Sequence, residues 1–202
     1  MSAARGERPK GRRRWSERGR LVLAAFLLFN VGASVVTEEF RRFAMHAYRI
    51  PSSAMEPTLH CGRPGLGCDG DTGDRILVVR FAPFWTPSRG DIIVFDPPPE
   101  AAVMCGARGA FVKRLIGLPG ETVTEKSGII FVNGKRLLEA YVKSRRRDSR
   151  SGSWRVPKGK YFFMGDNRAQ SCDSRYFGSV LRSKLVGPVV ARYWPFDRFS
   201  LL

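Results

Sequence analysis

The residues best suited to chemistry lie in one short segment, residues 50–59, which reads Ile-Pro-Ser-Ser-Ala-Met-Glu-Pro-Thr-Leu. Pro51 and Pro57 fix the backbone angle φ and remove hydrogen-bond donors, so we expect an extended or turning backbone rather than a helix. Ser52 and Ser53 add two hydroxyl groups. A stiff segment of this kind suits a site in which main-chain N–H groups must point at a reacting carbonyl oxygen. Taken alone, it is more typical of an ordinary loop rich in serine and proline.

A lysine within an apolar stretch is the second chemical feature. Lys113 lies in the sequence Phe-Val-Lys-Arg-Leu-Ile, residues 111–116. Successive side chains of a strand point to opposite faces, so Lys113 and Arg114 would separate, one toward a site and the other toward solvent. Burial favours the neutral amine, which can then accept a proton. Periodicity alone does not exclude two solvated basic residues.

Several segments resemble, in the right order, the sequence boxes of bacterial type I signal peptidases. The matching segments are residues 51–59, 73–78, 89–95, 112–121 and 165–178. In that family the first box carries a serine nucleophile and the fourth carries a catalytic lysine. The resemblance extends over roughly residues 48–193. It implies a serine–lysine endopeptidase that removes signal peptides from exported preproteins.

One position departs from the family pattern. The family has its nucleophilic serine immediately before the methionine of the first box, where this chain has Ala54. A methyl group cannot attack a peptide bond, so we expect little or no peptidase activity from the chain as written. Ser53 lies one residue earlier. In extended backbone its side chain would face away from Lys113, so we do not expect it to replace the nucleophile.

The resemblance implies roles for the remaining site residues. Lys113 takes the position of the general base, and Ala54 that of the nucleophile. The Ser52 hydroxyl and the backbone N–H of Ala54 take the positions of the oxyanion hole, and Ser171 that of a serine which orients the lysine. No metal and no organic cofactor are implied.

The last box also implies a structural ion pair between Asp173 and Arg175. Asp166 and Arg168 are expected to make turn and packing contacts. The implied substrate is an extended peptide with small residues in an A-x-A pattern before the cleaved bond, bound by addition to a strand.

Short runs rich in β-branched and aromatic residues, separated by turns, predict a mainly β fold. With the resemblance, we expect an antiparallel, barrel-like domain of signal peptidase type, preceded by one N-terminal transmembrane helix. A small cap, about residues 122–160, is expected as an insertion because Asn133-Gly134 is a strong hairpin-turn signal within it.

The N-terminal part has the composition of a membrane anchor. Residues 1–20 hold eight Lys or Arg against two Glu, and residues 21–36 are apolar apart from Asn30 and Ser34. We expect a transmembrane helix over residues 21–37, and the helical spacing of Phe40, Phe43 and Ala44 extends the helical pattern toward Tyr48. A cleavable signal peptide is the alternative, which the family resemblance disfavours.

The positive charge before this segment predicts a cytoplasmic tail over residues 1–20 and an extracytoplasmic domain over residues 38–202 in the plasma membrane. The formal net charge of +17 favours an anionic lipid bilayer as a partner. A membrane-tethered nucleic-acid binder is a weak alternative, since no nucleic-acid-binding motif is visible.

Four cysteines allow three disulfide pairings. Cys61 and Cys68 flank a Gly/Pro-rich loop and are candidates for a local bridge, which leaves Cys105 and Cys172 as the second pair. Two histidines and no paired C-x-x-C spacing argue against a zinc site.

Two interpretations of Ala54 therefore stay open. In the first, the chain is a catalytically inactive relative that binds preproteins or a membrane partner. In the second, serine has been changed to alanine in an otherwise active enzyme.

Overall fold

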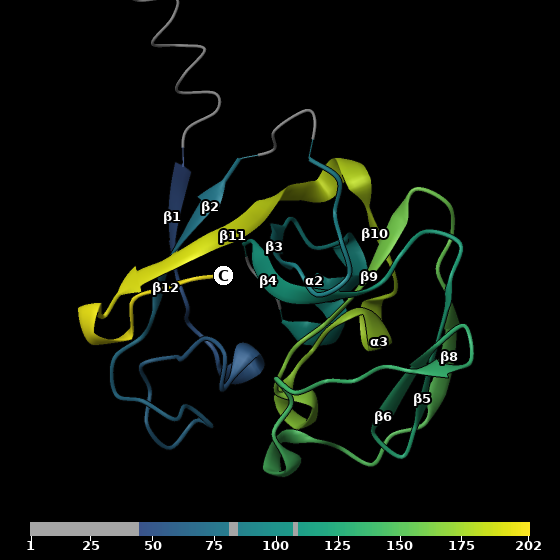
Figure 1. The fold of residues 1–202 in the computed structure, drawn as a ribbon, viewed down its shortest axis with the longest axis horizontal. Helices are drawn as coiled ribbons and strands as arrows, with labels where there is room; N and C mark the ends of the chain where they lie inside the picture. Colours follow the sequence, from purple (N-terminus) through teal and green to yellow (C-terminus); the bar gives the residue numbers. More distant parts are fainter. Residues whose placement is uncertain (1–44, 81–84, 107–108) are drawn as a thin grey trace, which may run out of the picture. The chain divides into compact units, whose positions relative to one another are not determined.

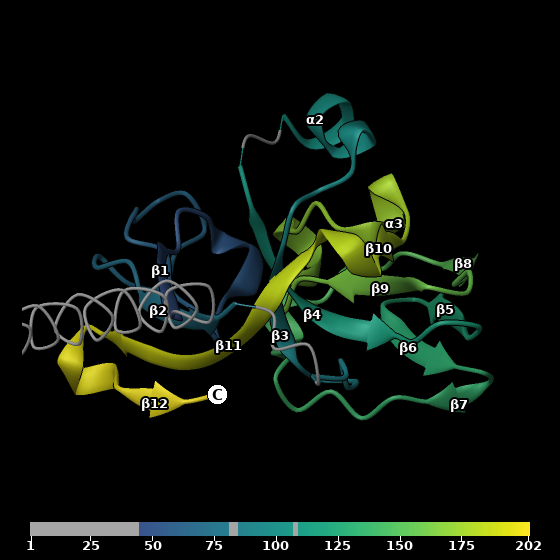
Figure 2. The ribbon, with the colours of Figure 1, turned by 90° about the horizontal axis from the view of Figure 1, so that it is seen from above.

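The computed structural model describes residues 45–80, 85–106 and 109–202. Within them, strands pair into two antiparallel sheets (Figures 1 and 2). The larger sheet has the order β1-β2-β11-β3-β4-β9-β10, and β12 pairs with β11. Its strands are β1 (Met45–Arg49), β2 (Arg75–Val79), β3 (Ile92–Phe95), β4 (Phe111–Gly117), β9 (Lys160–Met164), β10 (Val180–Leu181), β11 (Leu185–Trp194) and β12 (Ser200–Leu201). The prediction of a mainly β, antiparallel fold is confirmed.

The strands of the smaller sheet lie between β4 and β9 in the sequence, and they pair in the order β7-β6-β5-β8. Its strands are β5 (Thr122–Lys126), β6 (Ile129–Val132), β7 (Lys135–Arg136) and β8 (Gly152–Arg155). Asn133 and Gly134 join β6 to β7 with φ angles of 49° and 79°, the positive values that a type I′ turn requires. Ser127 and Gly128 join β5 to β6 in the same way, with φ angles of 46° and 75°. Serine is uncommon at positive φ, which is why the sequence did not signal this second turn.

A shared hydrophobic cluster joins the two sheets. It contains Ile116, Phe162 and Met164 from β4 and β9, and Val123, Ile130 and Val132 from β5 and β6. Side chains pack tightly over Gly117, where a Cβ atom would lie 2.6 Å from Cγ2 of Val123. The smaller sheet is therefore packed directly against the strand that carries Lys113.

Two short α-helices, α2 (Pro99–Cys105) and α3 (Ser174–Phe177), lie beside each other outside the larger sheet (Figure 2). The Pro-, Ala- and Gly-rich composition of residues 96–109 predicts a loop, and this prediction is wrong for the α2 residues. Pro99 at the first helical position and Gly106 with φ of 60° at the C-cap are ordinary helix start and stop signals. The helical extension toward Tyr48 is also wrong for residues 45–48, because β1 pairs with β2 over Met45–Arg49.

Among the residues that the structure describes, no helix is long and apolar enough to cross a membrane. The basic tail, residues 1–20, and the predicted transmembrane helix, residues 21–37, lie outside the described residues.

Candidate active site

A cavity of about 320 Å³ opens between the first box and the lysine strand. Three parts of the chain form its walls: the segment that leads into the 3₁₀ helix η1 (Ser53–Met55), the start of β4, and the residues around α2 and the 3₁₀ helix η3 (Arg168–Gln170). The lining residues are Ile50, Pro51, Ser52, Ala54, Met55, Cys105, Ala110, Phe111, Val112, Lys113, Gln170 and Cys172. Fold topology thus brings Ser52, Ala54 and Lys113 to one cavity, although almost 60 residues separate Ala54 from Lys113 in the sequence.

The first box turns into a helix where sequence analysis expected none. Ser52 is extended, with φ of −135° and ψ of 158°, and the next three residues form η1. Asn167 holds this turn, because its backbone N–H donates to the Ala54 carbonyl at 3.1 Å and its side-chain amide donates to the Ser53 carbonyl at 3.0 Å. A proline at each end of the box did not prevent one turn of 3₁₀ helix, which needs few internal hydrogen bonds.

The Ser53 side chain is hydrogen-bonded to Gln170, a residue that lines the same cavity as Ala54. Its hydroxyl donates to Oε1 of Gln170 at 3.3 Å, and Ser53 is absent from the cavity lining. A 3₁₀ helix has three residues per turn, so neighbouring side chains diverge without strand alternation. That the Ser53 side chain faces away from Lys113 stays a prediction.

Lys113 is almost fully buried, with 5 % of its surface exposed. It pairs with Ile93 across the β3–β4 ladder, and its Nζ atom lies 5.3 Å from the centre of the Phe111 ring. Burial lowers the pKa of Lys113 to about 8, although the carboxylates of Asp173 and Asp166 act in the opposite direction. A substantial fraction of neutral amine is therefore present near physiological pH.

Ser171 lies against the first box. A Cβ atom built on Gly165 would lie 2.2 Å from Ser171 Oγ and 2.4 Å from the Ala54 carbonyl oxygen, so both groups crowd the backbone of Gly165. The Ser171 hydroxyl is buried and has no hydrogen-bond partner within the described part of the chain. Buried hydroxyls without partners are unusual, and a functional role is one accepted explanation.

Asp173 and Arg175 form a buried, two-pronged ion pair. Arg175 donates from Nε to Oδ1 of Asp173 at 2.9 Å and from Nη2 to Oδ2 at 3.0 Å. Arg175 also reaches Glu125 at 3.3 Å and Asp148 at 2.7 Å, so the pair connects the last box to the smaller sheet. Burial alone would raise the pKa of Asp173, but the charge and hydrogen bonds of Arg175 hold it below its usual value. The N–H of Gly165 donates to Asp173 as well, at 3.0 Å.

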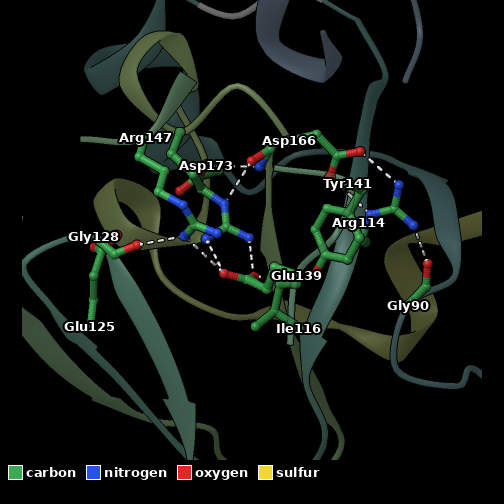
Figure 3. Close-up of polar contacts among 12 residues, drawn as sticks. Gly90, Arg114, Ile116, Glu125, Gly128, Glu139, Tyr141, Arg147, Asp166 and Asp173 are labelled. Carbon is green, nitrogen blue, oxygen red and sulfur yellow. Dashed lines mark hydrogen bonds and ion pairs between the residues drawn. The ribbon is translucent and has the colours of Figure 1, made fainter. Parts of the chain in front are cut away.

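Arg114 does not line the cavity that Lys113 lines, and its guanidinium points toward Asp166 and Gly90 (Figure 3). It donates to both carboxylate oxygens of Asp166, at 2.8 and 2.6 Å, and to the Gly90 carbonyl at 2.8 Å. The alternation predicted for Lys113 and Arg114 is confirmed, and the outward residue is a structural ion-pair partner rather than a solvated one.

Glu139 is a structural residue that sequence reasoning missed. It is 6 % exposed and accepts two hydrogen bonds from the guanidinium of the fully buried Arg168 side chain. Nη1 of Arg147 also lies 3.7 Å from Oε2 of Glu139 (Figure 3). No local motif surrounds Glu139, so only the fold reveals this contact.

Both candidate disulfides are present, Cys61–Cys68 and Cys105–Cys172. The second bridge connects the end of α2 to the residue after Ser171 and lines the cavity.

Comparison with known proteins identifies the family to which the chain belongs. Residues 21–194 match the family model described as signal peptidase, peptidase S26. The chain belongs to this family. It is 37% identical over 189 residues to a probable signal peptidase I-2 of Synechocystis, covering 93% of this chain and 77% of that protein.

Two further signal peptidase I relatives support the same conclusion. The protein of Leptolyngbya laminosa is 38% identical over 175 residues, covering 85% of this chain and 80% of its own length. That of Bacillus caldolyticus is 35% identical over 182 residues, covering 83% and 90%. The peptidase S26 family is one of serine endopeptidases, which agrees with the order of boxes in the sequence.

Proposed function

We propose that the chain is a membrane-bound homologue of signal peptidase I which binds the signal peptides of exported preproteins and, with alanine at position 54, does not hydrolyse them. The observation that carries this proposal is the shared cavity: Ala54 and a buried, pKa-lowered Lys113 line the same space. The general base of a serine–lysine mechanism is in place, and the nucleophilic oxygen is missing.

The remaining roles in this proposal are carried over from the family resemblance. With serine at residue 54, the neutral amine of Lys113 would take the hydroxyl proton as the oxygen attacks the peptide carbonyl. The Ser52 hydroxyl and the N–H of residue 54 would donate to the oxyanion, and the N–H persists with alanine because it belongs to the main chain. The Ser171 hydroxyl, buried beside the first box, would orient the lysine.

The proposed substrate is an extended peptide with small side chains before the scissile bond. The cavity wall is largely apolar, with Ile50, Met55, Phe111 and Val112 contributing side chains. Asp173 and Arg175 would act indirectly, because their ion pair would fix the backbone that carries Ser171.

For the location, we propose the plasma membrane. Residues 21–37 would span the bilayer, residues 1–20 would lie in the cytoplasm, and residues 38–202 would lie outside, with the cap at about 122–160 inserted into the domain. The motivation is the basic tail before the apolar segment. Protease added to intact cells should then digest the domain, whereas digestion of the tail alone would contradict this orientation. Enrichment of the protein on vesicles with anionic lipids would support the proposed lipid partner.

The test of function compares the chain as written with Ala54→Ser and Ser53→Ala on a purified preprotein. The chain as written should bind the preprotein without cutting it, Ala54→Ser should cut it, and Ser53→Ala should behave like the unchanged chain. Cleavage by the unchanged chain that disappears in Ser53→Ala would contradict the proposal. Absence of cleavage in Ala54→Ser, with binding retained, would leave a binding protein whose site lacks more than the serine.

A further inference from the structure

We propose that the Cys105–Cys172 disulfide is a specificity-determining wall of the peptide-binding cavity, which limits the size of the substrate side chain that can enter. The inference rests on the proposed function, since it takes the occupant of the cavity to be an extended peptide. Neither the sequence boxes nor the family comparison assigns a role to these two cysteines.

The first observation is position. Cys105 and Cys172 both line the cavity that Ala54 and Lys113 share, and a covalent bond joins them. Their residues are 67 apart in the sequence, and the enclosed loop contains Lys113 and Ser171. The bridge is therefore part of the cavity wall.

The second observation concerns what holds this wall in place. Ala101 is fully buried in the core, and Cys105 packs at the edge of the same cluster. The other side chains of α2 are exposed, and Val103 and Met104 are 89% and 54% exposed. Figure 2 shows α2 standing out from the sheet. The disulfide thus adds a covalent attachment at the C-terminal end of α2.

The partner cysteine belongs to a rigid part of the fold. Cys172 lies between Ser171 and Asp173, which are 4 % and 0 % exposed. Asp173 is held by Arg175 and by the N–H of Gly165. Cys172 is therefore flanked on both sides by buried residues, one of which belongs to a buried ion pair.

The chemistry of the lining gives the direction of the effect. The two cysteines share the cavity lining with the apolar residues Met55 and Val112. A closed wall of this kind accepts a small apolar side chain and excludes a branched one by steric overlap. In a rigid pocket one methylene group changes selectivity by roughly 10- to 200-fold, so loss of the wall should be measurable.

The experiment uses the full chain in lipid nanodiscs and measures equilibrium binding of labelled signal peptides that differ at one position, Ala, Val or Leu, before the cleavage site. Ala54 removes turnover, so affinities are read without cleavage. The unchanged chain should prefer the Ala peptide over the Leu peptide by about tenfold or more. In Cys105→Ala/Cys172→Ala the ratio should approach one, mainly because the Leu peptide binds more tightly.

Two further variants distinguish the effect of losing the cavity wall from a general effect on folding. Val103→Ala/Met104→Ala alters exposed residues of the same helix outside the cavity and should keep the full preference. Cys105→Val/Cys172→Val refills the space without a covalent bond and should recover part of the preference. Thermal unfolding identifies any variant that fails to fold, and the valine pair then carries the test.

The outcomes are distinct. An unchanged Ala-to-Leu ratio in both cysteine pairs, or an equal loss of affinity for all three peptides, would overturn the assignment of the disulfide as a specificity wall while leaving the proposed function intact. Binding of none of the peptides by the unchanged chain would overturn the proposed function, and this inference with it.

Discussion

Lys113 and Arg114 are adjacent on β4, yet the fold surrounds their charges in opposite ways. Arg114 makes a two-pronged ion pair with Asp166, at 2.8 and 2.6 Å, on one side of the sheet. Lys113 lines the cavity on the other side and has no ion pair among the residues that the structure describes. Strand alternation therefore places the ion-paired Arg114 and the cavity-lining Lys113 on opposite faces of the sheet, although they are neighbours in the sequence.

The unpaired burial of Lys113 predicts that Lys113→Met stabilises the protein at neutral pH. The folded-state pKa of about 8 lies below the ordinary value of 10.5, so below pH 8 the folded chain carries the full cost of a buried charge. That cost is roughly 3 kcal/mol at 1.36 kcal/mol per pKa unit, and it disappears as the pH rises from 8 to about 10.5.

Chemical denaturation of both proteins at pH 7 and pH 10 measures this difference. The matched control is Arg114→Met, which should destabilise the protein at both pH values because it leaves Asp166 buried without its partner. Equal stability gains for Lys113→Met at pH 7 and pH 10 would show that hydrophobic packing, not the charge, is responsible.

The second prediction concerns the pH dependence of Ala54→Ser. Because the base must be neutral, kcat/KM for preprotein cleavage should rise with pH and level off above an apparent pKa near 8. Adding Lys113→Met to Ala54→Ser should abolish cleavage. A profile that rises instead with an apparent pKa near 10 would mean that the lysine is solvated when the site works.

Gly165→Ala should disturb the site by crowding the backbone of the first box and the Ser171 hydroxyl. Its Cβ atom would lie 2.4 Å from the Ala54 carbonyl oxygen, a backbone atom, as well as 2.2 Å from Ser171 Oγ. Since the backbone of η1 must move, we expect a stability loss of about 1–3 kcal/mol, typical of overpacking. In the Ala54→Ser background kcat should fall more than KM changes. Gly134→Ala, at a turn with open space around it, is a control for local strain alone.

Loss of Arg175 should be among the most destabilising single changes. Arg175→Met would leave Asp173, Glu125 and Asp148 without their shared cation, and breaking a buried pair costs about 3–5 kcal/mol. Arg175→Lys keeps the charge but not the planar fork, so its loss should be smaller. Denaturant midpoints rank the three proteins. A change of less than about 1 kcal/mol in Arg175→Met would place the network among weak surface pairs.

The sequence allowed prediction of the antiparallel fold, the Asn133–Gly134 turn and the separation of Lys113 from Arg114, because each depends on local pattern and two-residue periodicity. It did not reveal η1, since that turn depends on hydrogen bonds from Asn167, more than a hundred residues later. The α2 helix was missed despite usable capping signals, because Pro and Gly were interpreted as loop residues.

The polar network was harder still to predict. Glu139 and Arg168, or Arg175 and Glu125, carry no mark in the sequence that pairs them, because each contact exists only after the smaller sheet has packed on β4 and β9. The roles of Ser52 and Ser171 came from resemblance to the family, and periodicity or spacing had no part in them.

Asn167 holds the first box by the carbonyl groups of Ser53 and Ala54, and neither bond involves the side chain of residue 54. The local fold is therefore indifferent to whether that residue bears a hydroxyl. Serine and alanine at position 54 are therefore both compatible with these two hydrogen bonds. An exchange of serine and alanine at this position can thus occur without a change in the surrounding fold, and the reverse substitution needs only one residue.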